Sequence, residues 1–290
     1  MLEFARWITE RDYRAALMAA GLALLPMLAP LSCAVLALVA LQRGPGAAWR
    51  TGAFGAAMMV LVAMVVGAHP AAGVLSALTI WAPTLAVTQL LMSSGSLSWA
   101  ARLATTAAVV LAGTWALAAP MQGEPWLGVV RDTIAPLAQA GADTALLAER
   151  LLALMPGIIA TSLLLMSLCG LFAAMWLHAG LARPGAFGEA FRSLQFGPVV
   201  GGVAALAIVA AAAGAGPVAW AVALPAGTAL LLQGLAVMHG LVRVKGMNKA
   251  WLFAGWAALV LLSPWAMMAF AAWGMADTLL DLRRRAAGGI

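Results

Sequence analysis

The sequence predicts an all-α fold, a polytopic bundle of about eight to ten transmembrane helices whose first and last segments are broken. Of its 290 residues, 64% are hydrophobic and only 9% are charged, whereas roughly a quarter of the residues of a soluble domain are charged. Apolar runs of membrane-spanning length alternate with short cationic turns, as expected for a chain in a bilayer. We therefore expect one integral membrane domain over residues 1–290.

The net charge of +6 does not indicate nucleic-acid binding. The cations lie between apolar segments, where they set orientation and contact anionic lipid headgroups. The bilayer and its headgroups are the predicted partners. Cys33 and Cys169 lie inside apolar runs and are expected in the core, and no metal-ligand spacing occurs, so no cofactor or metal is expected.

The chain begins with a charged lead, residues 1–12, predicted to be an interfacial helix. The first apolar run, residues 13–41, is longer than a hydrocarbon core of roughly 30 Å requires. Pro26 and Pro30 lie in its middle, where each removes a backbone donor. This run predicts either one kinked span or two short helices.

The middle of the chain predicts three spans that contain few charges. They lie near residues 51–68, 73–92 and 99–119, after a basic turn at 43–50. The long polar connection that follows, residues 121–150, carries four carboxylates and two arginines. Its apolar residues have helical spacing, so we expect an amphipathic external loop along the membrane surface.

Four further apolar runs complete the chain, at residues 151–181, 198–213, 218–242 and 250–276. A semi-polar connector, residues 182–197, separates the first two. The last run contains Pro264 and, like the first, predicts either one kinked span or two short helices.

The distribution of basic residues favours the two-helix arrangement for both Pro-containing runs. If every run crosses once and the N-terminus is cytoplasmic, half of the 16 basic residues lie inside, which is no bias. If residues 13–41 and 250–276 each form a helix pair, all except Arg131 and Arg150 lie inside, as the positive-inside rule requires. Both termini and the 182–197 connector are then cytoplasmic, and loop 121–150 is external. Because the helices of each pair would be short for a full membrane crossing, re-entrant helices are the alternative.

Two stretches carry a family resemblance. HGLVRVKG at 239–246, followed by Trp251, Pro264 and the ending DTLLDLR, resembles the YybS-like bacterial integral membrane proteins. Residues 185–194 are similar to the Gly-Gly-Phe-Gly-Glu-Phe connector of that family, from which Ala186 and Ala190 depart.

The resemblance implies a bacterial cytoplasmic (inner) membrane protein without an established activity. At fold level this family is grouped with the substrate-binding S components of energy-coupling-factor transporters and with the shape-determining MreD proteins. S components present small residues of their first helix to a coupling partner. Ala15, Ala19 and Ala23 form such a stripe, which indicates either a docking face or ordinary close helix packing.

Gln89, Gln233 and His239 are the candidate solute-binding residues. The two glutamines are the most deeply embedded polar residues, and polar groups in hydrocarbon are costly. They predict either a shared solute pocket or interhelical hydrogen bonds worth on the order of 1 kcal/mol. His239 and Arg243 share a helix face and indicate either an anion site or an interfacial anchor.

Charged residues predict a coupling or structural cluster. Glu189 and Arg192 are spaced for an intrahelical ion pair. We expect Asp281 to pair with its own arginines and Asp277 to pair with Arg243 or Lys245, because an isolated carboxylate on the membrane side would be costly. The predicted cluster is Glu189, Arg192, Arg243, Lys245, Asp277, Asp281 and Arg284.

No P-loop, nucleophile elbow, embedded carboxylate pair or metal motif occurs, so no enzyme is expected. Two functions remain open. A transport-type solute-binding protein needs a cavity with convergent polar groups. A non-catalytic scaffold of envelope or cell-shape machinery needs a docking surface for a membrane protein partner. The broken first segment favours transport, because broken helices usually line a cavity or are buried in protein.

Overall fold

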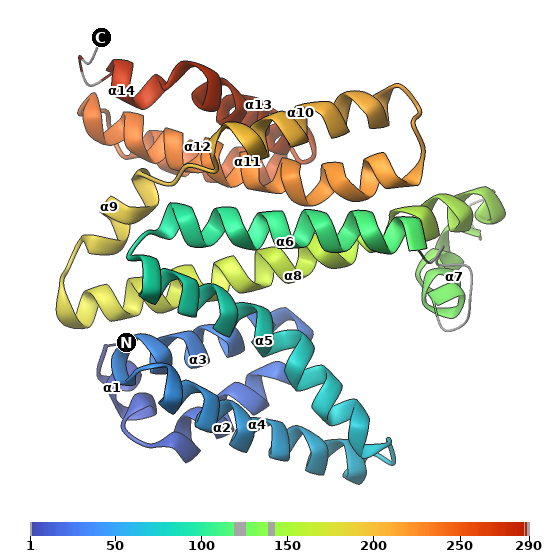
Figure 1. The fold of residues 1–290 in the computed structure, drawn as a ribbon, viewed down its shortest axis with the longest axis vertical. Coiled ribbons are helices and arrows are strands. Elements are labelled where there is room, and N and C mark those ends of the chain that lie inside the picture. The colour runs from blue at the N-terminus through green and yellow to red at the C-terminus, as the bar shows by residue number, and fades with distance from the viewer. Residues whose placement is uncertain (1, 119–125, 139–142, 287, 289–290) are drawn as a thin grey trace. The chain divides into compact units, whose positions relative to one another are not determined.

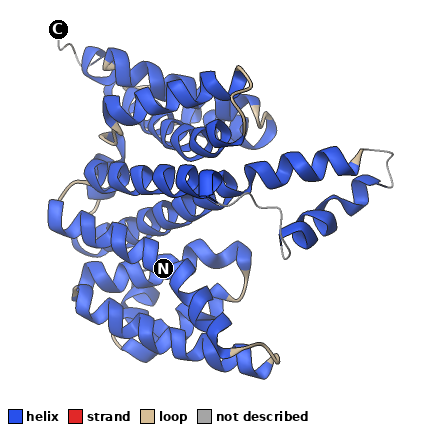
Figure 2. Cartoon of the chain, turned by 45° about the vertical axis from the view of Figure 1, so that its right-hand side comes forward, coloured by secondary structure: helices blue, strands red, loops and turns tan. Residues whose placement is uncertain are grey.

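The computed structural model describes residues 2–118, 126–138, 143–286 and 288, and within them it contains helices and no strand (Figure 2). The first helices are α1 (Leu2–Thr9), α2 (Asp12–Ala23), the 3-10 turn η1 (Pro26–Leu28), α3 (Ala29–Arg43), α4 (Pro45–Val65), α5 (Pro70–Ser94), α6 (Leu97–Ala118) and α7 (Trp126–Ala138). They are followed by α8 (Thr144–Ala182), α9 (Ala186–Arg192), α10 (Gly197–Ala212), α11 (Pro217–Val244), α12 (Ala250–Leu261), α13 (Trp265–Leu280) and α14 (Leu282–Ala286). The predicted all-α helix bundle is confirmed.

Six helices of the described chain are long and apolar enough to cross a membrane. They are Pro26–Arg43, Pro45–Val65, Pro70–Ser94, Leu97–Ala118, Thr144–Ala182 and Pro217–Val244. A seventh span results if α9 and α10, which meet at an angle of 54°, count as one. The protein is therefore a membrane protein with several apolar spans. A count of eight to ten would require the shorter helices α2, α12 and α13 to cross as well, and that remains a prediction.

The chain divides into two compact helical units (Figure 1). Unit 1 consists of Met1–Ala104 and Leu163–Gln195, and unit 2 consists of Thr105–Ser162 and Phe196–Ile290. The chain passes between the two units at three places. Two of these boundaries fall inside helices, α6 and α8, and the third falls in the loop before α10.

In unit 1 the first apolar run folds into two antiparallel helices, α2 and α3, joined through η1. The Ser32 hydroxyl on α3 donates to the Ala19 carbonyl on α2 at 2.7 Å and accepts from the Trp81 indole N–H at 2.8 Å. The stripe of Ala15, Ala19 and Ala23 is buried in the core of this unit. The stripe therefore serves close packing inside the unit and offers no exposed docking face.

In unit 2 the last apolar run is also a helix pair, α12 and α13, separated at Ser263 and Pro264. α13 runs beside the largely buried α11 in the same direction, and α12 runs in the opposite direction (Figure 1). Gly234 and Gly274 face the backbone of the opposing helix, which lets α11 and α13 approach closely. Gly201 similarly brings α10 against Thr278 of α13.

The arms of both hairpins are short. α2 and α12 have 12 residues, α3 has 15 and α13 has 16, which gives lengths of about 18–24 Å. A hydrocarbon core is about 30 Å thick. In the last hairpin both arms are therefore shorter than a full crossing, whereas in the first hairpin only α2 is, because η1 and α3 together form the 18-residue span Pro26–Arg43. The two ends of each hairpin return to the same end of its unit, as the charge distribution predicts.

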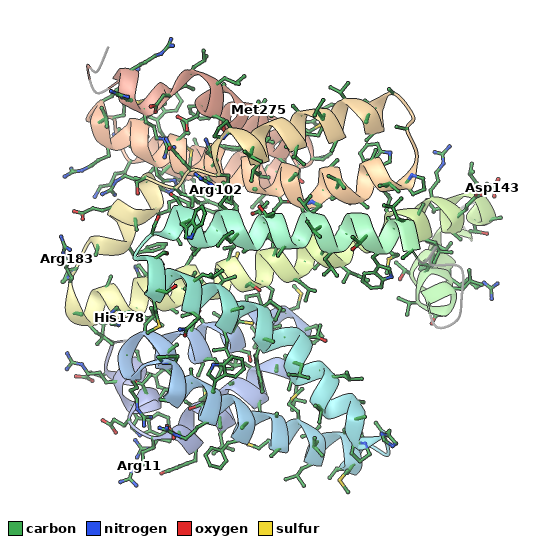
Figure 3. The ribbon with its side chains drawn as sticks, in the orientation of Figure 1. Arg11, Arg102, Asp143, His178, Arg183 and Met275 are labelled. Atoms are coloured by element: carbon green, nitrogen blue, oxygen red, sulfur yellow. The ribbon has the colours of Figure 1, made fainter. Side chains whose placement is uncertain are left out.

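Labelled charged residues lie at one end of each unit. In unit 1, Arg11, Arg102 and Arg183 lie at one end (Figure 3). In unit 2, Asp143 lies at the end where α10 joins α11, away from α14 (Figures 1 and 3). The region predicted as an external loop contains α7 and the start of α8, which share an apolar core of Val130, Ile134 and Leu152; residues 121–125 and 139–142 lie outside the described residues.

The first prediction concerns topology. In a background with Cys33 and Cys169 replaced by alanine, Ser193→Cys should react with a membrane-impermeant maleimide only after the cells are permeabilised, because α9 lies at the basic end of unit 1. Asp143→Cys should react in intact cells. Labelling of Ser193→Cys from outside would contradict the orientation of the whole chain.

The second prediction concerns the contact between α11 and α13. A Cβ at position 274 would collide with the Leu230 carbonyl oxygen, so Gly274→Ala should lower Tm in detergent by several degrees, as overpacking typically costs about 1–3 kcal/mol. The matched control is Gly202→Ala on α10, where a Cβ meets open space. Equal Tm values for both variants would show that the helices do not approach as closely as described.

Candidate functional site

The amide of Gln233 lies at the centre of a closed polar network in unit 2. Its side chain is on α11, and the residue is only 1% exposed. The carbonyl oxygen accepts from the Phe196 backbone N–H at 3.0 Å, and the amide nitrogen donates to Asp277 Oδ2 at 2.9 Å and to Thr278 Oγ1 at 3.0 Å. Both amide hydrogens are therefore used, and Gln233 joins the start of α10, α11 and α13.

Asp277 is the charged centre of this network. Its side chain is 0% exposed, and that of Arg283 is 11% exposed. Arg283 Nη2 donates to Asp277 Oδ2 at 2.7 Å and Nε donates to Oδ1 at 3.3 Å, a two-pronged contact that suits guanidinium and carboxylate. Burial without this partner would leave an uncompensated charge, the costly case for any carboxylate in a low-dielectric interior.

The turn at Asp281 makes this pairing possible. Asp281 ends α13 with φ 48° and ψ 56°, a left-handed conformation, and its N–H bonds to the Asp277 carbonyl at 2.9 Å. On a continuous helix, two residues six apart are rotated by about 240° around the helix axis and therefore lie on different faces. The left-handed residue changes the direction of the chain between α13 and α14, so that Arg283 of α14 contacts Asp277 of α13.

The predicted pairing of Asp277 is confirmed, but the predicted partners were wrong. Arg243 in the last turn of α11 and Lys245 directly after it are exposed, and Arg283 takes the place predicted for them. The sequence interpretation treated the ending as one continuous helix. On such a helix Arg283 faces away from Asp277, and only a cation from another element could reach it.

The remaining charged residues of the predicted cluster do not join it. Asp281 forms no ion pair with an arginine in the described chain, and Arg284 is exposed. Glu189 on α9 is exposed and forms no ion pair with Arg192, against the prediction. Three phenylalanines anchor α9 instead, with Phe172 of α8 5.5 Å from Phe191 and 6.1 Å from Phe187 between ring centroids.

The other two candidate solute residues are separate from this network. Gln89 lies exposed on α5 in unit 1, whereas Gln233 is buried on α11 in unit 2. His239 lies one and a half turns beyond Gln233; its Nδ1 is 2.8 Å from the Leu235 carbonyl oxygen, and its ring packs edge-on to Trp256 at 6.3 Å. His239 thus contacts α12, and the amide of Gln233 is hydrogen-bonded to protein groups of unit 2.

Unit 1 contains a second charged tie that sequence reasoning missed. Asp12 begins α2, and its two oxygens bind Arg43 Nη1 at 2.6 Å and Arg50 Nε at 3.4 Å. Arg43 also donates to the Thr9 carbonyl at 3.2 Å. Asp12 therefore holds the open ends of the first hairpin and the start of α4 together. In the sequence, this ion pair is indicated by a carboxylate just before the first apolar run and arginines just after its end.

These networks connect helices to one another. Gln233 and Arg283 both donate to Asp277, and no group of three or more potential metal-ligating side chains occurs among the described residues. Comparison of the chain with protein-family models, with curated proteins and with solved structures finds no match. The fold and the networks themselves must therefore support any functional inference.

The third prediction tests the buried ion pair. Asp277→Asn should lower Tm in detergent by on the order of 10 °C, because it leaves Arg283 without its buried partner, a loss of about 3–5 kcal/mol. The matched control, Glu189→Gln, removes an exposed and unpaired carboxylate and should change Tm little.

The pair can be isolated with a double-mutant cycle of Asp277→Asn and Arg283→Gln. The double variant should be much more stable than the sum of the single losses implies, since neither residue is left charged without a partner. Additive losses would contradict a direct interaction between the two side chains.

Proposed function

We propose that this chain is a non-catalytic, multi-pass protein of the bacterial cytoplasmic membrane, with both termini inside, that binds a solute as a transport component in the manner of S components. The observation that carries the proposal is that each of its two units contains a helical hairpin that is broken near prolines and has at least one arm too short to cross a membrane. In secondary transporters built from two repeats, interrupted helices in the two halves form the substrate site near the middle of the membrane.

The surroundings of the breaks support this reading. Met27, at the break between α2 and α3, is 91% exposed, and Trp265, directly after the break between α12 and α13, is 73% exposed. Backbone outside a helix is tolerated at membrane depth only where protein or water covers it. The two breaks therefore require a neighbour other than lipid chains, and a wet cavity or a coupling protein would supply one.

A specific observation favours a second function, a scaffold of envelope or cell-shape machinery similar to MreD. The most buried polar amide, that of Gln233, is hydrogen-bonded to protein groups through both its oxygen and its nitrogen. A solute site centred on Gln233 would require the network to open. In the scaffold alternative the breaks are docking points for a partner protein, and membership of the YybS-like group fits either function.

The fourth prediction distinguishes the two. A photo-crosslinking amino acid in place of Met27 or Trp265, introduced in cells that naturally make the protein, should capture a subunit of an energy-coupling ATPase. A small polar molecule should co-purify with the protein in a native lipid disc. The control site is Leu206, an exposed residue in the middle of α10.

Capture of cell-wall or cell-shape proteins at Met27 and Trp265 would support the scaffold and contradict transport. Capture of lipid alone at all three positions would contradict both functions, because the breaks would then need no covering partner.

A further inference from the structure

A cavity of about 470 Å³ lies between α11, α12 and α13 in unit 2, outside the network of Gln233. This volume is within the range of small-molecule sites, about 300–1,000 Å³. Apolar side chains form most of the lining, among them Met238, Leu241, Trp251, Phe270 and Trp273. Lys245 contributes the one charged side chain among the lining residues. The cavity is thus an apolar chamber with a cation at one side.

Lys245 lies at the charged end of the cavity. α11 ends at Val244, so Lys245 begins the turn that follows, between the exposed Arg243 in the last turn of α11 and the exposed Lys249 before α12. Trp251 follows at the start of α12, and tryptophans favour the boundary between headgroups and hydrocarbon. The cavity therefore extends from the charged end of unit 2 toward its apolar interior.

α12 forms a weakly held wall of this cavity. None of its 12 residues is buried. Phe253, Val260 and Leu261 point large apolar side chains outward, as on a helix that faces lipid on its outer side. Gly255 lies against the Met238 sulfur, which brings the wall close to α11 at one point. The cavity is accordingly bounded by a helix that contacts lipid on its outer side.

We infer that this cavity binds an anionic phospholipid, with one acyl chain among the apolar side chains and the phosphate beside Lys245. A polar solute would find a single charged group and almost no hydrogen-bonding partners in the lining, whereas an acyl chain needs no hydrogen-bonding partner and packs against the apolar side chains by dispersion contacts. Basic pockets between transmembrane helices are known to select anionic headgroups. Lys245, which the sequence indicated as a partner for Asp277, is left exposed and available for this role.

The fifth prediction tests the lipid site with delipidated protein in detergent, titrated with phosphatidylglycerol or phosphatidylcholine and followed by native mass spectrometry. Phosphatidylglycerol should bind to the first site more tightly than phosphatidylcholine. Lys245→Gln should weaken phosphatidylglycerol about fivefold, the factor that corresponds to about 1 kcal/mol for one cation, and should leave phosphatidylcholine unchanged. Ala254→Trp, which fills the cavity, should weaken both lipids.

Two matched controls separate the site from the general surface. Lys249→Gln removes an exposed cation that does not line the cavity, and Val260→Trp enlarges an outward-facing residue of α12; both should bind as the unaltered protein does. Equal binding of the two lipids, equal losses for Lys245→Gln and Lys249→Gln, or unchanged binding in Ala254→Trp would each overturn the proposal. Tm measurements confirm that each variant is folded, and Lys245→Gln alters only an exposed side chain.

Discussion

The arrangement of unit 2 depends on one buried carboxylate. Asp277 lies where hydrocarbon-facing helices meet, with a side chain that is 0% exposed, and an unpaired charge there would cost several kcal/mol. Arg283 supplies the opposite charge and Gln233 a further hydrogen bond. The requirement to satisfy this carboxylate fixes the turn at Asp281, the return of α14, and the contact of α13 with α11 and with the start of α10.

In unit 1 a different carboxylate, that of Asp12, forms ion pairs at one end of the helices. Asp12 binds Arg43 and Arg50 and so joins the two open ends of the α2–α3 hairpin to α4. Ser32 of α3 donates to the Ala19 carbonyl of α2 and accepts from Trp81 of α5, so it joins the hairpin to α5. In both units a short broken hairpin is secured by a carboxylate at its open end, while its break remains exposed. Stability thus comes from one end of each hairpin, and the other end is available for contact with another molecule.

The sequence was sufficient to predict the helical class, both broken segments and the pairing of Asp277. Apolar length, proline position and the cost of an isolated charge act locally and leave a visible pattern. It was not sufficient to predict Arg283 as the partner, because that depends on one left-handed residue, Asp281, whose type gives no strong turn signal. It also missed Asp12, whose arginines lie 31 and 38 residues away, and it could not tell whether the amide of Gln233 faced a solute or protein, because that depends on how α10 and α13 pack.

The most direct test of this account is a dipolar-recoupling solid-state NMR measurement in lipid bilayers, on protein with ¹³C-labelled aspartate and ¹⁵N-labelled arginine. The account predicts two groups of aspartate carboxyl carbons in close contact with guanidinium nitrogens, those of Asp12 and Asp277. Arg283→Gln should remove the contact of Asp277 and leave that of Asp12, while Arg243→Gln should remove neither. A pattern that is unchanged in Arg283→Gln, or an Asp277 contact that is lost in Arg243→Gln, would contradict the account.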